Sequence, residues 1–132
     1  MVGRTKRRGV IRIFIADDQS VVREGIKRII ADIADMCVVG EGKVDQEMSV
    51  HVSAQPVDVL IVDTAVPGGS GLESLKALRH AQPWLGMLVF SGQAEHHYAI
   101  RAFKAGAKGY LVKDSQPEEL LRAIRKVAQG GC

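Results

Sequence analysis

The 132-residue sequence predicts an α/β fold in which helices cover both faces of a five-stranded, doubly wound parallel sheet. Five apolar runs alternate with segments of helical periodicity, and these runs are apolar throughout rather than at every second residue. Strands buried on both faces of a parallel sheet have this continuous apolar character, and right-handed crossover helices connect them.

The amino-terminal half predicts two strand–helix units. The expected elements are a strand at 10–16, a helix at 20–34, a strand at 36–40 and a weaker helix at 44–54. The first helix has one apolar face, formed by Val22, Ile26, Ile29, Ile30 and Ile33. Gln55 and Pro56 end the weaker helix, because the residue before a proline disfavours helical geometry.

The carboxyl-terminal half predicts three more units. The expected elements are a strand at 57–62, a helix from 72 that stops before Pro83, a strand at 86–90, a helix at 95–105, a strand at 109–112 and a final helix. The loop before the third helix contains Pro67, Gly68, Gly69 and Gly71, and Leu72, Leu75 and Leu78 line that helix. Ser115 and Glu118 predict a capping box for the final helix, whose apolar face carries Leu120, Leu121, Ile124 and Val127.

Composition indicates one globular domain with 46% hydrophobic and 25% charged residues. No apolar run approaches the roughly 20 residues of a membrane span, and no signal-peptide pattern is present, so we expect a cytoplasmic protein. We expect residues 1–9 to form a basic, disordered leader and residues 10–132 to form the folded domain. The leader alone carries more positive charge than the net +3 of the whole chain. Cys37 and Cys132 show no metal-binding spacing and are expected to be free thiols.

Polar residues directly follow four of the predicted strands. They are Asp17 and Asp18 after the first strand, Asp63 after the third, Ser91 after the fourth and Lys113 after the fifth. Because the carboxyl ends of parallel strands open on one edge of the sheet, we expect these side chains to converge there. Three carboxylates, a hydroxyl and an amine suit a divalent cation together with a phosphoryl group.

The acidic residues favour a metal site. Asp17 or Asp18 alone would suffice to cap the following helix, whereas two carboxylates about 5 Å apart repel each other by roughly 3 kcal/mol unless a cation offsets them. Hard oxygen ligands with room for water favour Mg²⁺. Asp63 is the candidate nucleophile because a carboxylate can accept a phosphoryl group, although it could also be a polar strand terminus.

The other candidates have ordinary structural explanations beside the functional ones. Lys113 can pair with Asp63 and then with a phosphoryl oxygen, and Ser91 can donate to the same group while Gly92 leaves space. Tyr110 either packs half-buried or swings inward when Ser91 is drawn toward a phosphate. The adjacent His96 and His97 do not share a helical face and are expected to be solvated.

Several motifs in this order resemble the receiver domain of two-component response regulators, over about residues 10–131. The motifs are ADD at 16–18, LIVD ending at Asp63, Pro67 followed by GGSGLE, SG at Ser91 and AGAKGYLVKD at 105–114. GLESLKALR and PEELLRAIRKVAQGG are similar to the NarL/FixJ (LuxR-type) subfamily. The resemblance implies a flavodoxin-like (βα)5 fold with strand order 2-1-3-4-5.

The resemblance also implies a role for each position. Asp63 would be the phosphoacceptor, and it would bind Mg²⁺ with Asp18 and the carbonyl of Ala65 while Asp17 assists. Ser91 and Lys113 would bind the phosphoryl oxygens, and Tyr110 would couple the site to an output surface. The donor would be the phosphohistidine of a sensor kinase. The resemblance allows a homodimer on phosphorylation and leaves the oligomeric state and the dimer face open.

The sequence departs from this family in three places. Val66 replaces a common methionine, GKVDQEMSVHVSAQ lacks the usual alanine- and glycine-rich pattern, and the chain stops at Cys132 where a helix-turn-helix DNA-binding domain is expected. We therefore expect either an excised receiver from a transcriptional regulator or a stand-alone one acting through protein contacts. A phosphohydrolase using Asp63 is disfavoured, because Ala65 stands where such enzymes often place a general acid. We expect no enzymatic activity other than Mg²⁺-dependent self-phosphorylation and autodephosphorylation.

Overall fold

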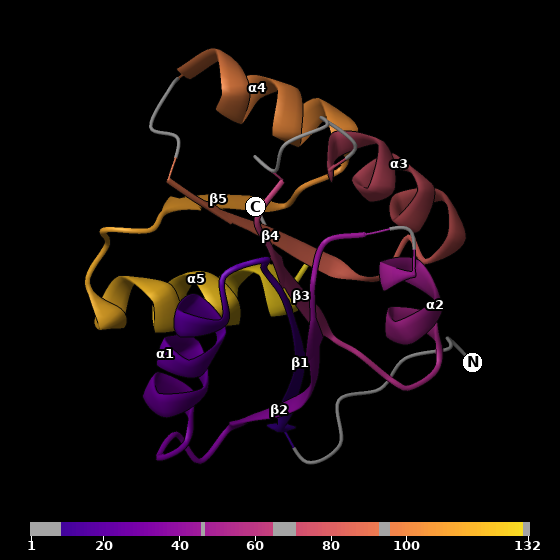
Figure 1. Cartoon of the computed structure of the whole chain (residues 1–132). Helices are drawn as coiled ribbons and strands as arrows, with labels where there is room; N and C mark the ends of the chain where they lie inside the picture. The colour runs from indigo at the N-terminus through magenta and orange to yellow at the C-terminus, as the bar shows by residue number, and fades with distance from the viewer. Residues whose placement is uncertain (1–8, 46, 65–70, 93–95, 131–132) are drawn as a thin grey trace.

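A computed structural model describes residues 9–45, 47–64, 71–92 and 96–130 of the chain. Its five strands form one parallel sheet in the order β2-β1-β3-β4-β5 (Figure 1). The strands are β1 (Ile11–Ala16), β2 (Met36–Gly42), β3 (Val59–Val62), β4 (Gly86–Ser91) and β5 (Gly109–Val112). The predicted fold class and strand order are confirmed.

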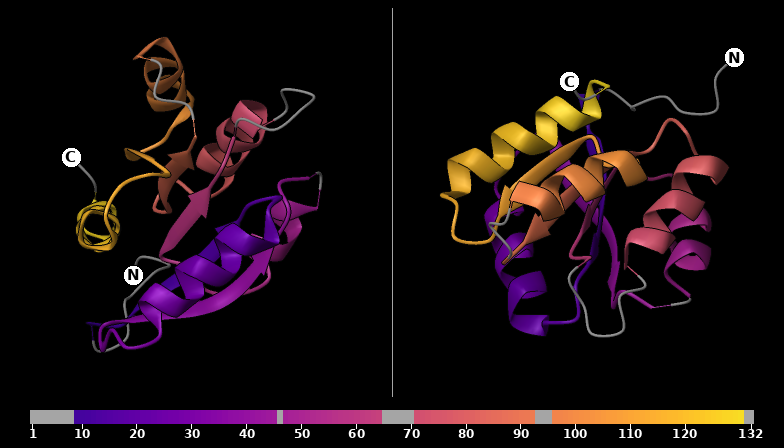
Figure 2. Two further views of the ribbon diagram at one scale, coloured as in Figure 1. Left: turned by 60° about the vertical axis from the view of Figure 1, so that its left-hand side comes forward. Right: turned by 90° about the horizontal axis from the view of Figure 1, so that it is seen from above.

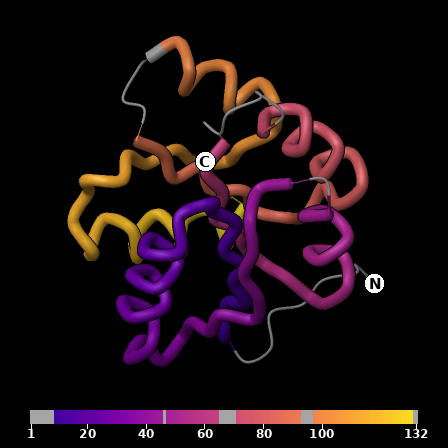
Figure 3. Tube along the Cα trace, viewed as in Figure 1, coloured from indigo at the N-terminus to yellow at the C-terminus, as the bar shows by residue number. Residues whose placement is uncertain are grey.

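The helices form two layers, one on each face of the sheet (Figure 2). They are α1 (Ser20–Ile30), α2 (Met48–Ser53), α3 (Gly71–Ala81), α4 (His96–Ala105) and α5 (Pro117–Ala128). Apolar residues of α1 and α5 pack in one core cluster, and those of α2, α3 and α4 pack in the other. The trace in Figure 3 shows α1 and α5, from opposite ends of the chain, on the same side of the sheet.

The two core clusters explain why the strands are continuously apolar. In β1, Ile11, Ile13 and Ile15 belong to the cluster that contains α1 and α5. Phe14 and Ala16, which point to the opposite face because strand side chains alternate, belong to the cluster with α2, α3 and α4. A strand between two helical layers therefore has no solvated face.

Several predicted boundaries differ from those in the structure. Helix α1 ends at Ile30 rather than at 34, because residues 31–35 form turns in which the Ile33 N–H bonds the Ile30 carbonyl at 2.9 Å. Ile33 nevertheless packs against the core, which explains its helical spacing in the sequence. Strand β2 runs on to Gly42 and α2 begins only at Met48, and between them the N–H of Val44 bonds Asp18 Oδ1 at 2.9 Å.

The predicted capping box at Ser115 and Glu118 is wrong by one position. Gln116 is the N-cap of α5, and its N–H bonds the Glu119 side chain at 2.8 Å. Pro117 follows at the first helical position, where its missing N–H costs nothing and its fixed φ suits the helix. The proline therefore sets the register of this helix start. Leu120, Ile124 and Val127 are buried, as the predicted apolar face requires.

Three further predictions concern the termini, the cysteines and membrane association. Cys37 lies half-buried in β2 as a free thiol. Residues 1–8 of the predicted leader at 1–9, and Cys132, lie outside the described residues. Among the helices of the described part of the chain, none is long and apolar enough to cross a membrane.

An ion pair joins β1 to the start of β3. Asp58 is 8% exposed, and its carboxylate accepts hydrogen bonds from the Arg12 backbone N–H at 2.8 Å and from Arg12 Nε at 3.1 Å. In return, the Asp58 N–H bonds the Arg12 carbonyl at 2.8 Å. This pair secures the amino-terminal edge of the sheet, opposite the edge at which the strands end.

Replacing Asp58 with alanine should lower the free energy of unfolding by about 3 kcal/mol, because the Arg12 guanidinium loses a buried counter-ion. Urea denaturation followed by circular dichroism measures the change. The control is Asp35→Ala, which removes an exposed pair with Arg125 and should barely shift the midpoint. Equal shifts for the two variants would contradict a structural role for the buried pair.

Candidate functional site

Strand register brings the predicted polar residues to one level of the sheet. Ala16 pairs with Val62, so Asp17 and Asp63 leave β1 and β3 side by side. Ser91 pairs with Val112, and the N–H of Lys113 bonds the Ser91 carbonyl at 2.8 Å. The carboxyl ends of these strands therefore meet at one edge, as expected for a parallel sheet.

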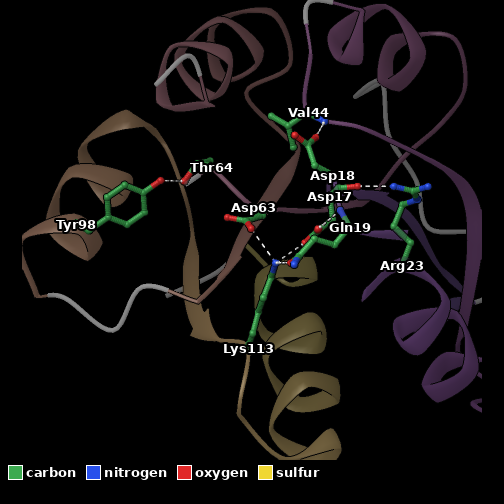
Figure 4. A network of polar contacts seen from close by, with 9 residues as sticks. All are labelled: Asp17, Asp18, Gln19, Arg23, Val44, Asp63, Thr64, Tyr98 and Lys113. Atoms are coloured by element: carbon green, nitrogen blue, oxygen red, sulfur yellow. Dashed lines mark hydrogen bonds and ion pairs between the residues drawn. The ribbon is translucent and has the colours of Figure 1, made fainter. Parts of the chain in front are cut away.

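Lys113 follows β5 at one end of this edge, and its side chain brings the ammonium between Asp17 and Asp63 (Figure 4). Its Nζ is 2.8 Å from Asp17 Oδ2 and 2.7 Å from Asp63 Oδ2. Asp17 is buried, and the side chains of Asp63 and Lys113 are only 13% and 18% exposed. One ammonium thus balances two carboxylates that would otherwise repel each other in a poorly solvated place.

The pKa of Lys113 reflects two opposing influences. Burial lowers it and is the largest single influence, but the hydrogen bonds that Lys113 donates to Asp17 and Asp63, together with the negative charges of these two residues, outweigh it, so the pKa of Lys113 is raised. The side chain is therefore a stable cation at neutral pH. A positive charge held beside Asp63 is suited to neutralising an anionic group delivered to that carboxylate.

The side chain of Asp18 points in a different direction from that of Asp17. It is exposed, and its Oδ1 accepts a hydrogen bond from the Val44 N–H at 2.9 Å (Figure 4). Within the described part of the chain, no group of three or more His, Cys, Asp or Glu side chains is arranged to hold a metal ion. Ala65, whose carbonyl was a predicted ligand, lies outside the described residues.

The donor chemistry at this edge nevertheless fits Mg²⁺. Asp17, Asp18 and Asp63 offer hard carboxylate oxygens, and the exposed Asp18 leaves a side open to water. Mg²⁺ commonly takes only one or two carboxylates and keeps several waters, so it needs no closed protein cage.

Ser91 is fully buried as the last residue of β4, one strand away from Asp63. Gly92 follows it and is exposed, and a Cβ placed there would meet nothing within 4 Å. The structure therefore has open space beside Ser91, as predicted. The serine's contact with a phosphoryl group stays a prediction.

Two residues that sequence analysis did not single out contact Asp17. Gln19 donates its N–H to Asp17 Oδ1 at 2.8 Å and accepts from Lys113 Nζ at 2.9 Å. Arg23 donates from Nη1 to the Asp17 carbonyl at 2.6 Å and from Nε to Glu41 at 2.9 Å. The only sequence signal for Gln19 was its place directly after Asp17 and Asp18, because its side-chain partner, Lys113, is 94 positions away.

Comparison with known proteins identifies the family. The family profile described as "Response regulator receiver domain" matches residues 13–125. The chain belongs to the response regulator receiver domain family. It is 37% identical to the transcriptional regulatory protein YxjL of Bacillus subtilis over 91% of this chain and 55% of that protein. It is also 37% identical to the nitrate/nitrite response regulator NarL of Escherichia coli K12, over 89% of this chain and 55% of NarL.

A solved structure supports the same assignment. The two-component response regulator of the LuxR family from Aurantimonas sp. SI85-9A1 matches with a TM-score of 0.86 and 32% identity, over 92% of this chain and 87% of that one. The predicted resemblance to NarL- and LuxR-type receivers is confirmed. The chain spans about half the length of the curated relatives it matches.

A second polar contact links the site of this receiver domain to α4. The hydroxyl groups of Thr64, directly after Asp63, and Tyr98 of α4 form a short hydrogen bond (Figure 4). Tyr98 packs edge-to-face on Tyr110 of β5, with ring centroids 6.2 Å apart and an interplanar angle of 67°. Burial is the main reason that the pKa of Tyr98 is raised. Tyr110 is half-buried, so packing accounts for its present place, and its switch role stays a prediction.

The receiver domain needs a glycine where α3 begins beside the residue that follows Asp63. Gly71 was predicted to belong to the loop before this helix, but it is the first residue of α3. A Cβ at Gly71 would lie 2.5 Å from the Thr64 carbonyl oxygen and 2.6 Å from Thr64 Cα. Any side chain here would displace the backbone next to Asp63.

The remaining predicted residues add little to the site. His97 is exposed in the first turn of α4, and the side chain of His96 lies outside the described residues.

The Thr64–Tyr98 hydrogen bond should stabilise the receiver domain by about 1 kcal/mol. Thr64→Val and Tyr98→Phe remove one hydroxyl each while keeping side-chain volume. Urea denaturation of both single variants and the double variant should give a coupling energy of about 1 kcal/mol. Strictly additive losses would show that the two hydroxyls do not depend on each other.

Proposed function

We propose that this receiver domain accepts a phosphoryl group on Asp63 and converts the modification into a changed protein surface. The observation that carries the proposal is the Lys113 ammonium, which lies 2.7 Å from Asp63 Oδ2 in a chain of the response regulator receiver family. The proposed donor is the phosphohistidine of a sensor kinase.

The transfer is a displacement at phosphorus. A carboxylate oxygen of Asp63 forms a bond to phosphorus, the bond between phosphorus and the donor's imidazole nitrogen breaks, and the electron pair of that bond stays on the nitrogen. The product is an aspartyl phosphate. Because phosphoryl transfer depends mostly on positioning and charge neutralisation, Lys113 is placed to bind a phosphoryl oxygen as it gives up its contact with the carboxylate.

We propose Mg²⁺ as the cofactor. Asp18, Asp63 and the Ala65 carbonyl would hold it, with Asp17 assisting through water. When bound, the ion neutralises negative charge on the phosphoryl oxygens. Asp17 and Asp63 would share their oxygens between this role and the Lys113 ammonium, to which each gives one oxygen in the present structure.

The output is proposed to pass through Ser91 and Tyr110. A phosphoryl group on Asp63 would draw the Ser91 hydroxyl toward it, vacate space beside β4 and let Tyr110 move inward. Tyr110 already contacts Tyr98 of α4, so a change in its position would reach the surface formed by α4, β5 and α5.

Partners follow from the relatives. YxjL is named an uncharacterized transcriptional regulatory protein and NarL a nitrate/nitrite response regulator. We propose that phosphorylation favours a homodimer of this receiver, and that DNA is contacted by a helix-turn-helix domain beyond this chain rather than by the receiver. The chain's own chemistry would be confined to phosphorylation and autodephosphorylation of Asp63 in the cytoplasm.

Incubation with Mg²⁺ and acetyl phosphate should add one phosphoryl group to the native chain, measured by intact mass spectrometry. Asp63→Asn should abolish the addition, because the amide is not a nucleophile at neutral pH. Asp32→Asn, which changes an exposed aspartate in the turn after α1, is the matched control and should be modified like the native chain. Modification that survives Asp63→Asn would remove Asp63 from its proposed role.

Lys113→Met should still bind Mg²⁺ but respond less to phosphorylation, because the ammonium that links the phosphoryl group to β5 is gone. Methionine keeps the apolar stem in place. The measurement is the set of backbone amide shifts in α4 and β5 with and without beryllofluoride, a stand-in for the phosphoryl group. Shifts equal to those of the native chain would contradict the assigned part of Lys113.

A further inference from the structure

The Lys113 ammonium uses all of its hydrogen-bonding capacity. It contacts Asp17 Oδ2 at 2.8 Å, Asp63 Oδ2 at 2.7 Å and Gln19 Oε1 at 2.9 Å. An ammonium group has three N–H donors, so each acceptor takes one. Two of these acceptors are carboxylates that a divalent cation would attract, whereas the Gln19 amide is neutral.

Gln19 has an unusual place for this contact. It is the N-cap of α1, a position that favours Ser, Thr, Asp or Asn, and its side chain makes no capping hydrogen bond. The side chain instead spans to Lys113 at the far end of the sheet edge, although Gln19 is exposed and no burial forces it there (Figure 4). Its backbone N–H meanwhile holds Asp17 Oδ1 at 2.8 Å. One residue therefore contacts both members of the Asp17–Lys113 ion pair.

This arrangement matters once a cation competes for Asp17. Both oxygens of Asp17 are engaged, Oδ1 by Gln19 and Oδ2 by Lys113. A cation drawn to Asp17, directly or through a water, competes with the ammonium for Oδ2, and the two positive charges repel each other. An ammonium with no further acceptor would stay bound to Asp17 and resist the cation.

We propose that Gln19 is a positioning residue for Lys113. Its amide oxygen holds the ammonium within reach of Asp63 while Asp17 passes to a divalent cation. The inference rests on the proposed function of this site, but it concerns cation binding and is tested without phosphoryl transfer.

The test is a double-mutant cycle of Mg²⁺ affinity, measured by isothermal titration calorimetry at constant ionic strength. Gln19→Leu keeps most of the side-chain volume and removes the acceptor, so the dissociation constant for Mg²⁺ should rise about threefold to tenfold. Lys113→Met removes the competing ammonium and should tighten Mg²⁺ binding. Adding Gln19→Leu to Lys113→Met should change the affinity by less than about twofold, because the amide then has nothing to hold.

Two controls separate positioning from a structural effect. Gln19→Glu restores an oxygen at the same reach and should bind Mg²⁺ at least as tightly as the native chain. Gln116→Leu changes the N-cap glutamine of α5 and should leave Mg²⁺ affinity unchanged. Thermal unfolding midpoints close to the native value should accompany both Gln19 variants, since the residue is exposed.

The inference is overturned if Gln19→Leu binds Mg²⁺ as tightly as the native chain, if the same loss persists in Lys113→Met, or if the native chain binds no Mg²⁺. These results are distinguishable from failure of the proposed function. A chain that is phosphorylated on Asp63 but indifferent to Gln19→Leu keeps the function and loses the inference. A chain that shows the coupling between Gln19 and Lys113 but takes no phosphoryl group keeps the inference and loses the proposed function.

Discussion

The charge balance around the Lys113 ammonium is the interaction on which the site depends. Asp17 and Asp63 end neighbouring strands at the same level, in a place where at least one of them is almost fully buried. Two carboxylates there would repel each other, and a cation between them converts the repulsion into attraction. Lys113 supplies that cation from β5, two strands away from β3. Its contacts with Asp17 and Asp63 therefore connect the carboxyl ends of β1, β3 and β5.

The sheet topology explains why such distant residues meet. Strand β3 lies in the middle, with β1 and β4 beside it, so the residue after β3 is surrounded by the ends of its neighbours. Each helical layer also reaches this point. Gln19 and Arg23 approach Asp17 from the start of α1 on one face, and Tyr98 of α4 approaches Thr64 from the other. A charge change at Asp63 would therefore be felt by both layers, which suits a switch better than a turnover enzyme.

Much of the site could be predicted because parallel sheets obey a simple rule. The continuous apolar runs located the strands, and the shared edge at which parallel strands end then predicted that Asp17, Asp63 and Lys113 lie together. Local rules were weaker where neighbours compete. The capping box moved from Ser115 to Gln116 because Pro117 sets the first helical turn, and Val44, expected to begin the second helix, instead bonds Asp18 across 26 positions. Such competitors are not visible in a local pattern.

The sequence by itself determined the fold class, the strand order through its family resemblance, and the residue types at the ends of the strands, because these follow from periodicity and short motifs. Only the tertiary structure decided which atoms are partners: the Gln19 amide as the third acceptor for Lys113, Asp18 directed to Val44 rather than to its neighbour, and Thr64 joined to Tyr98. Those contacts depend on side-chain directions across long sequence separations. No local spacing encodes them, since each is settled by the packing of whole layers against the sheet.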